Sequence, residues 1–214
     1  MKTMLTRTLP ALLLALVAGQ LTMAPGAGAQ TAQSSMVQVE QKLASLRYDV
    51  GAVDGAVDSD TRSAILAFQK VNGLQRTGVL TDAVTSQIMA STAPPPPMVS
   101  DGEPNRVEVS LARQVLFLYE NGNLTRILAV ATGTSATPTP TGTFRLSRFD
   151  PGWHTSRLGR LYNATYFVGG YAIHGSLSVP AQPASHGCIR IAMSAAKWFP
   201  SHVGRGTQVV VIPG

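Results

Sequence analysis

The stretch STAPPPPMVSDGEP, residues 91–104, divides this chain of 214 residues into two parts. Each proline fixes its own φ and lacks a backbone N–H, so Pro94–Pro97 cannot continue a helix or a sheet ladder and favours extended polyproline II. A proline-rich segment of this kind acts as a semi-rigid spacer. We therefore predict that 91–104 is a linker that holds apart two folded units, 34–90 and 105–214.

The unit before the linker has the apolar pattern of a small helical module. Apolar side chains recur every three or four residues in three runs: Val39, Leu43 and Leu46; Ile65, Phe68 and Val71; Val84 and Ile88. Asp58 or Ser59 can cap the second helix, Gly73 can end it, and Thr81 can cap the third. The nearby aspartates lack the alternating spacing and final glutamate of an EF-hand calcium loop, so capping and turns explain them better.

The unit after the linker has the alternating pattern of β-strands. The alternating apolar residues are Val107, Val109 and Leu111, then Val115, Phe117 and Tyr119. Asn121-Gly122 is a hairpin signal. Further strands are expected near 127–131, 166–173 and 208–212, with a short helix at 194–202. The sequence thus predicts an α+β protein, in which a three-helix module precedes a mainly-β sandwich or barrel-like domain.

The first 29 residues have the composition of a secretory signal. Lys2 and Arg7 flank the start of a mostly apolar stretch, 9–21, and Ala27-Gly28-Ala29 matches a small-residue cleavage site. A retained membrane anchor is the alternative, but the apolar stretch is shorter than the roughly 20 residues that a bilayer needs. We expect cleavage after Ala29 and export to the periplasm or cell wall of a bacterium, with membrane contact only through this segment if it stays uncleaved.

Charge is distributed unevenly between the two units. The whole chain has a formal charge of +6, yet residues 30–104 sum to −3 and residues 105–214 to +7. The polyanions available to an exported protein are wall polymers and carboxylate-bearing wall peptides, so nucleic acid is not expected as a partner. A basic surface that serves only solubility is the alternative.

Two short segments of the second unit combine the residue types that nucleophilic catalysis requires. They are Ile173-His174-Gly175-Ser176 and Ala184-Ser185-His186-Gly187-Cys188-Ile189-Arg190. Cys188 is the only cysteine, so it cannot form an internal disulfide. A cysteine nucleophile needs a thiolate, which an imidazole base can generate, and glycines let backbone N–H groups approach a developing oxyanion. The pattern predicts catalysis by Cys188 with a histidine base and no cofactor.

Three other interpretations of these residues compete. Cys188 can be a small buried hydrophobe beside Ile189 and Ile191. His174, His186 and Cys188 can ligate zinc, although no fourth protein ligand is evident. The histidines can also be core residues satisfied by hydrogen bonds. Catalysis is favoured because two histidines flank the sole cysteine.

The first unit resembles the type 1 peptidoglycan-binding domain. The resemblance rests on Leu43, Leu46, Tyr48, Gly51, Asp54-Gly55, Thr61, Ala64, Phe68-Gln69, Gly73-Leu74 and Thr77-Gly78. It implies a module that targets the protein to the cell wall. A spacer or a regulatory bundle is the alternative.

The second unit resembles the catalytic domain of the L,D-transpeptidases, the YkuD family. The resemblance rests on His174-Gly175, on the Ser185–Arg190 motif nine residues later, and on the upstream element Thr139-Pro140-Thr141-Gly142-Thr143-Phe144. It implies a transpeptidase that forms 3→3 cross-links between peptidoglycan stem peptides and that carbapenems acylate. An L,D-carboxypeptidase with the same thioester, and a non-catalytic wall-binding protein, are the alternatives.

The resemblance also implies roles for the two central side chains. Cys188 would attack the carbonyl of the third residue of a tetrapeptide stem, a diamino acid, and expel the terminal D-alanine. His174 would act as the base and then as the acid, its ring oriented by a carbonyl near Gly175 or Ser176. The side-chain amine of a neighbouring stem would resolve the thioester.

The remaining site residues are implied in the same way. Backbone N–H groups at His186, Gly187 and Cys188 would form the oxyanion hole. Gly175 and Ser185 complete the motif, and Arg190 would hold the loop or meet a substrate carboxylate.

The segment before His174 is rich in glycine, arginine and aromatic residues. It contains Arg145, Arg148, Phe149, Trp153, Arg157, Arg160, Tyr162 and Tyr166. Because the substrate stem carries carboxylates, we predict that this stretch forms a basic lid over the cleft. An ordinary variable surface loop is the alternative.

Overall fold

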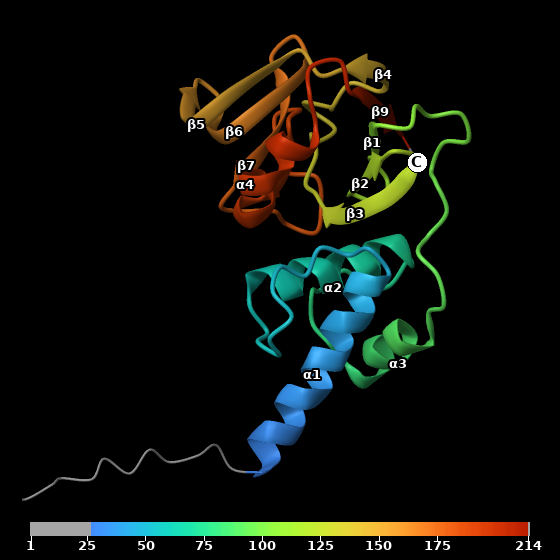
Figure 1. The fold of residues 1–214 in the computed structure, drawn as a ribbon. Coiled ribbons are helices and arrows are strands. Elements are labelled where there is room, and N and C mark those ends of the chain that lie inside the picture. Colours follow the sequence, from blue (N-terminus) through green and yellow to red (C-terminus); the bar gives the residue numbers. More distant parts are fainter. Residues whose placement is uncertain (1–26, 214) are drawn as a thin grey trace, which may run out of the picture.

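A computed structural model describes residues 27–213 of the chain (Figure 1). The predicted export signal, 1–29, lies outside the described residues apart from its last three. Among the helices of the described part, none has the length and apolar character needed to cross a membrane.

The described chain folds into a helical module followed by a β-rich domain. The helices are α1 Ala27–Ser45, α2 Ser59–Val71, α3 Asp82–Ala90 and α4 Met193–His202. The strands are β1 Arg106–Ser110, β2 Val115–Glu120, β3 Asn123–Ala129, β4 Gly142–Arg145, β5 Arg148–Ser156, β6 Gly159–Val168, β7 Tyr171–Ser176, β8 Ile189–Ala192 and β9 Gln208–Ile212. The predicted α+β class, with three helices before a mainly-β domain, is confirmed.

The helical module is held together by side-chain caps and one buried carboxylate. The Asp58 carboxylate accepts from the N–H of Thr61 at 2.9 Å and so caps α2, and Thr81 caps α3. Buried Glu40 of α1 accepts from the N–H of Gly55 at 2.8 Å and from the Thr61 hydroxyl at 2.9 Å. These carboxylates fix the loop between α1 and α2, as the capping interpretation predicted.

The β-rich domain contains two sheets. One has the strand order β3-β2-β1-β9-β4 and the other β5-β6-β7-β8. Strands β1 and β9 are parallel, as are β7 and β8, and the other pairs are antiparallel. Apolar side chains of both sheets meet α4 in a single core.

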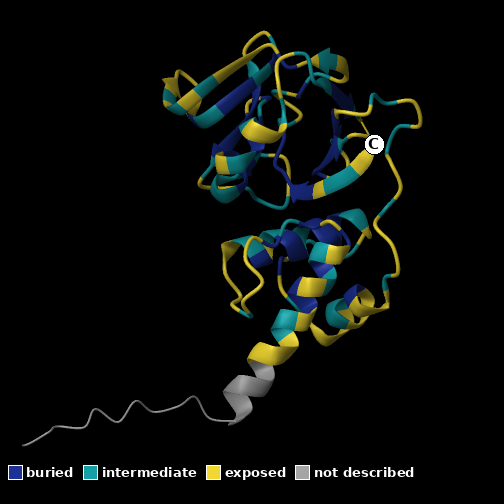
Figure 2. Cartoon of the chain, viewed as in Figure 1, coloured by how far each residue is buried: buried dark blue, intermediate teal, exposed yellow. Residues whose placement is uncertain are grey.

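The five-stranded sheet is buried on both of its faces. In β2, Leu116 and Leu118 face the core shared with the second sheet, whereas Val115, Phe117 and Tyr119 face the helical module. All five side chains are buried, and α2 lies against this face of the sheet (Figures 1 and 2). The helical module is therefore the third layer of one packed structure.

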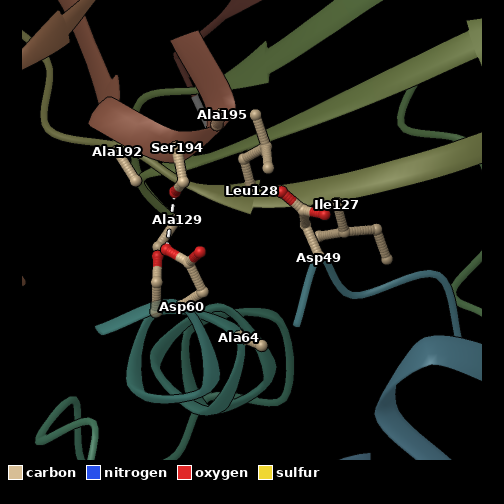
Figure 3. Close-up of a pocket in the computed structure, with 10 residues that line it drawn as sticks. Asp49, Asp60, Ala64, Ile127, Leu128, Ala129, Ala192, Ser194 and Ala195 are labelled. Carbon is tan, nitrogen blue, oxygen red and sulfur yellow. Dashed lines mark hydrogen bonds between the residues drawn. The ribbon is translucent and has the colours of Figure 1, made fainter. Parts of the chain in front are cut away.

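The prediction that the linker holds the two units apart is wrong. The linker itself contains no helix or strand, but the units on either side of it share a hydrophobic core. Polar contacts also cross the interface. Among them, Lys70 Nζ donates to the Val130 carbonyl at 2.8 Å, the Ile127 N–H donates to the Arg47 carbonyl at 2.7 Å, and Ser194 Oγ donates to Asp60 at 2.5 Å (Figure 3). The apolar outer face of the sheet draws the module onto it, because an exposed face of that kind would be unfavourable in water.

Lys70 lies on the face of α2 that packs against the sheet, and its ammonium group is buried there. Its side chain is 1% exposed. Burial and, to a smaller extent, the nearby Arg76 charge together lower the pKa of Lys70 to about 7. Near neutral pH the lysine is therefore partly uncharged, which reduces the cost of burying it at the interface.

Removing the helical module should destabilise the catalytic unit. A chain of residues 104–214 exposes Val115, Phe117, Tyr119 and Ile127, and each buried side chain of this kind stabilises by about 1.5–3 kcal/mol. We expect this chain to bind the dye ANS and to unfold at a lower urea concentration than the whole protein. Replacing Val115, Phe117 and Ile127 with threonine in the same chain should reduce ANS binding. An ANS-silent, fully stable catalytic unit would contradict the shared core.

Candidate active site

The two residues expected to carry the chemistry lie on, or immediately before, a pair of parallel strands. His174 lies on β7, and Cys188 immediately precedes β8, whose Arg190 is the register partner of His174. His174 and Cys188 both line a cavity of about 330 Å³. Ser185, His186 and Arg190 line the same cavity, so the structure brings these five predicted residues together.

The His174 ring is fixed and buried. His174 is 5% exposed. Its Nδ1 lies 2.9 Å from the carbonyl oxygen of Gly175, the carbonyl that the resemblance implied would orient the ring. Since a carbonyl only accepts, Nδ1 carries the proton and Nε2 is left as a base. Burial lowers the pKa of His174, the bond to Gly175 raises it, and the Arg190 charge lowers it. The net effect is a histidine that stays neutral at pH 7.

Cys188 is a half-buried thiol that needs a base. Burial raises the pKa of the Cys188 thiol, while a hydrogen bond from the Ala172 backbone and the Arg190 charge act in the opposite direction. The resting side chain is therefore a thiol at neutral pH. The neutral imidazole of His174 is the group in this cavity suited to remove its proton.

Gly187 gives the cysteine loop, residues 185–188, a shape that other residues cannot adopt. Its φ is +107°, and a Cβ atom there would lie 2.3 Å from the Tyr171 ring. Ser185 closes the loop, because its hydroxyl donates to the Cys188 carbonyl at 2.5 Å and accepts from the Gly187 N–H at 3.0 Å. The side chain of Cys188 is thereby presented at the cavity by a rigid turn.

The predicted oxyanion hole needs one correction. The Gly187 N–H is bonded to Ser185 Oγ, so in this conformation it is not available to an oxyanion. The N–H groups of His186 and Cys188 make no such bond to another described residue. These two groups are the better candidates for oxyanion donors.

The segment that follows β3, residues 132–139, is hydrogen-bonded to the cysteine loop. Thr139 Oγ1 accepts from the Gly133 N–H at 2.8 Å and donates to the Gly187 carbonyl at 2.8 Å. The Thr132 carbonyl accepts from the Ser185 N–H at 3.0 Å. Sequence reasoning gave these residues no role, although Thr139 belongs to the upstream element that marks the resemblance.

The predicted lid is the β5–β6 hairpin, and both its tip and residues of β6, Leu161 and Tyr166, line the cavity. Residues 156–159 between β5 and β6 line the cavity, together with Arg160. Arg160 lies over the Trp153 ring at 4.3 Å. Arg145 instead pairs with Glu103, and Arg148 pairs with Asp150, so these two arginines do not contribute to the site.

The histidines and Cys188 are not arranged as a metal-ligand set. Within residues 27–213, no group of three His, Cys, Asp or Glu side chains is placed to hold a metal ion. The zinc interpretation of His174, His186 and Cys188 therefore lacks the geometry it requires.

Comparisons with known proteins agree with this architecture. Residues 104–211 match the family model of the L,D-transpeptidase catalytic domain (YkuD), and residues 32–88 match that of a putative peptidoglycan binding domain. No curated protein matches the chain.

Two solved structures cover most of the chain. An L,D-transpeptidase (residues 123–326) from Xylanimonas cellulosilytica is 34% identical with a TM-score of 0.76, and the match covers 83% of this chain and 92% of that one. An L,D-transpeptidase from Stackebrandtia nassauensis is 25% identical with a TM-score of 0.52, covering 84% and 91%. Both matches extend over the helical module as well as the β-rich domain.

Alkylation of the single cysteine tests the electrostatics of the site. Because burial raises the thiol pKa, the rate of reaction of Cys188 with iodoacetamide should keep rising through pH 9. Arg190→Met removes a charge that favours the thiolate, so alkylation at pH 8 should slow about threefold. The control Arg113→Met changes the same charge on the outer surface and should have no effect. A rate that levels off below pH 8 would contradict the assignment.

Substitution of Thr139 tests its role as support for the cysteine loop. Thr139→Val leaves the Gly133 N–H and the Gly187 carbonyl without their partner, which should cost about 1–3 kcal/mol in urea unfolding. Amide hydrogen exchange at 185–188 should also accelerate. Thr139→Ser keeps the hydroxyl and should restore both measurements. Equal behaviour of the valine and serine variants would exclude this role.

Proposed function

This chain belongs to the L,D-transpeptidase family, and we propose that it is an exported enzyme that forms 3→3 cross-links in peptidoglycan through a thioester at Cys188. The observation that carries the proposal is that a buried, neutral His174 on β7 and the thiol of Cys188, immediately before the adjacent parallel strand β8, line the same cavity. The peptidoglycan-binding module and the basic charge of the catalytic unit, +7, fit a wall substrate that carries carboxylates.

The first half of the reaction makes the acyl-enzyme. His174 Nε2 takes the thiol proton, and the sulfur of Cys188 attacks the carbonyl of the diamino acid at position three of a tetrapeptide stem. The N–H groups of His186 and Cys188 stabilise the oxyanion. As the C–N bond breaks, the imidazolium returns its proton to the leaving D-alanine.

The second half transfers the acyl group to an amine. The side-chain amine of a second stem attacks the thioester, a C–N bond forms and the C–S bond breaks. The proton lost by the amine passes through His174 to the sulfur of Cys188, which restores the resting thiol. Because burial lowers the pKa of His174, the ring begins each half of the reaction as an unprotonated base at neutral pH.

A carbapenem tests the acyl-enzyme directly. Intact-protein mass spectrometry should show one covalent adduct on the wild type, because the thiolate opens the β-lactam ring and no water is lost or gained. Cys188→Ala should show none, and His174→Gln should acylate at least about 100-fold more slowly because it lacks the base. A folded wild type without an adduct would refute the thioester mechanism.

A further inference from the structure

A groove at the junction of the helical module and the catalytic domain is not explained by the chemistry at Cys188. This interdomain groove has a volume of about 650 Å³, within the range of ligand sites. One wall is formed by the first turns of α2 and by Thr77-Gly78, and the other by the end of β7, residues 177–179 and the start of α4. In Figure 1, α4 lies on the side of the catalytic domain that faces α2.

The groove borders the active-site cavity at Ser176. Ser176 lines both the catalytic cavity and the interdomain groove. It lies two residues after His174 on β7, so the two side chains share a face of the strand. The groove therefore meets the active site on the side of the catalytic base.

The charge of the groove is predominantly basic. Arg62 and Lys197 line it from opposite domains, both are exposed, and neither makes an ion pair with a described residue. Of the lining residues one is acidic, Asp60, and its carboxylate accepts the Ser194 hydroxyl. Unpaired cations on both walls of a groove are complementary to a ligand with carboxylates.

The wall supplied by the helical module is rigid. The buried amide of Gln69 accepts from the N–H of Gly78 at 2.7 Å and of Thr77 at 2.9 Å, and it donates to the Val79 carbonyl at 3.0 Å. The opposite wall carries Leu177, which is 82% exposed and offers an apolar contact. The groove thus combines one fixed wall, two cations and one exposed apolar side chain, which suits a peptide with carboxylates.

We propose that the interdomain groove binds the acceptor stem peptide, the one whose amine resolves the thioester. This inference rests on the proposed function and deepens it. In transfer, the incoming amine takes the position that the leaving group vacated, and both are served by the same base. The groove opens on the side of that base, so a stem held by Arg62 and Lys197 directs its amine toward His174 and the thioester.

The test separates donor use from acceptor use. A tripeptide stem that ends at the diamino acid lacks the bond to D-alanine, so it can only accept. We would titrate it against a fixed tetrapeptide donor and compare the wild type with Arg62→Ala/Lys197→Ala and with the control Arg113→Ala/Arg205→Ala, which removes the same charge elsewhere. The groove variant should raise the KM for the tripeptide about tenfold while acylation by a carbapenem is unchanged. The control should match the wild type.

Other outcomes would overturn the proposal. If the groove variant slows acylation by the tetrapeptide and leaves the tripeptide KM unchanged, the groove holds the donor. If neither changes, the groove holds no stem. Binding of the tripeptide to Cys188→Ala, measured by calorimetry, gives a readout without catalysis: it should weaken when Arg62 and Lys197 are removed. If the wild type is not acylated, the proposed function is wrong. If the affinity for the tripeptide does not change when Arg62 and Lys197 are removed, the groove is not the binding site of the acceptor stem.

Discussion

Strand β2 of the five-stranded sheet is apolar on both of its faces, and this constraint determines how the rest of the chain is arranged. Strand β2 presents Leu116 and Leu118 to one side and Val115, Phe117 and Tyr119 to the other. The first side is covered by the second sheet and α4, and the second by the helical module. Burial of the three side chains that face the module corresponds to roughly 5–9 kcal/mol, which is comparable with the whole stability of a typical domain. The module is therefore a structural part of the enzyme as well as a binding domain.

The same sheet carries the framework of the active site. At the end of β3, the Val130 carbonyl accepts from Lys70 of the module, and the next residue, Ala131, exchanges two hydrogen bonds with Arg190 of β8. The chain then passes behind the cysteine loop, where Thr139 bonds the Gly187 carbonyl. One continuous segment thus touches the module at one end and supports Cys188 at the other. A nucleophile supported in this way is pre-organised and needs little rearrangement to react.

The features that the sequence revealed are those with local causes. Asp58 and Thr81 cap helices within three residues of themselves, and His174 and Cys188 are recognisable because glycines and a motif surround them. The sequence analysis missed the packing of the two units against each other, because the composition of a linker does not show whether the units that it joins are in contact. The usable signal was the unbroken apolar run of β2, where Leu116 and Leu118 fill the gaps of the alternating set. The pairing of Arg145 with Glu103 joins residues 42 positions apart, so it depends on tertiary geometry, which the periodicity of the sequence does not encode.

A fixed interface between the module and the catalytic domain has a chemical consequence for the proposed reaction. The thioester can be resolved by an amine or by water, and water is always present, so transfer requires that the amine be held at a high effective concentration. A flexible tether would bring the enzyme to the wall without orienting either stem. The shared core instead places Arg62 of the module and Lys197 of the catalytic domain along one groove that borders the active-site cavity at Ser176. Burial of the sheet's outer face and selection of the acceptor are then two results of the same packing arrangement.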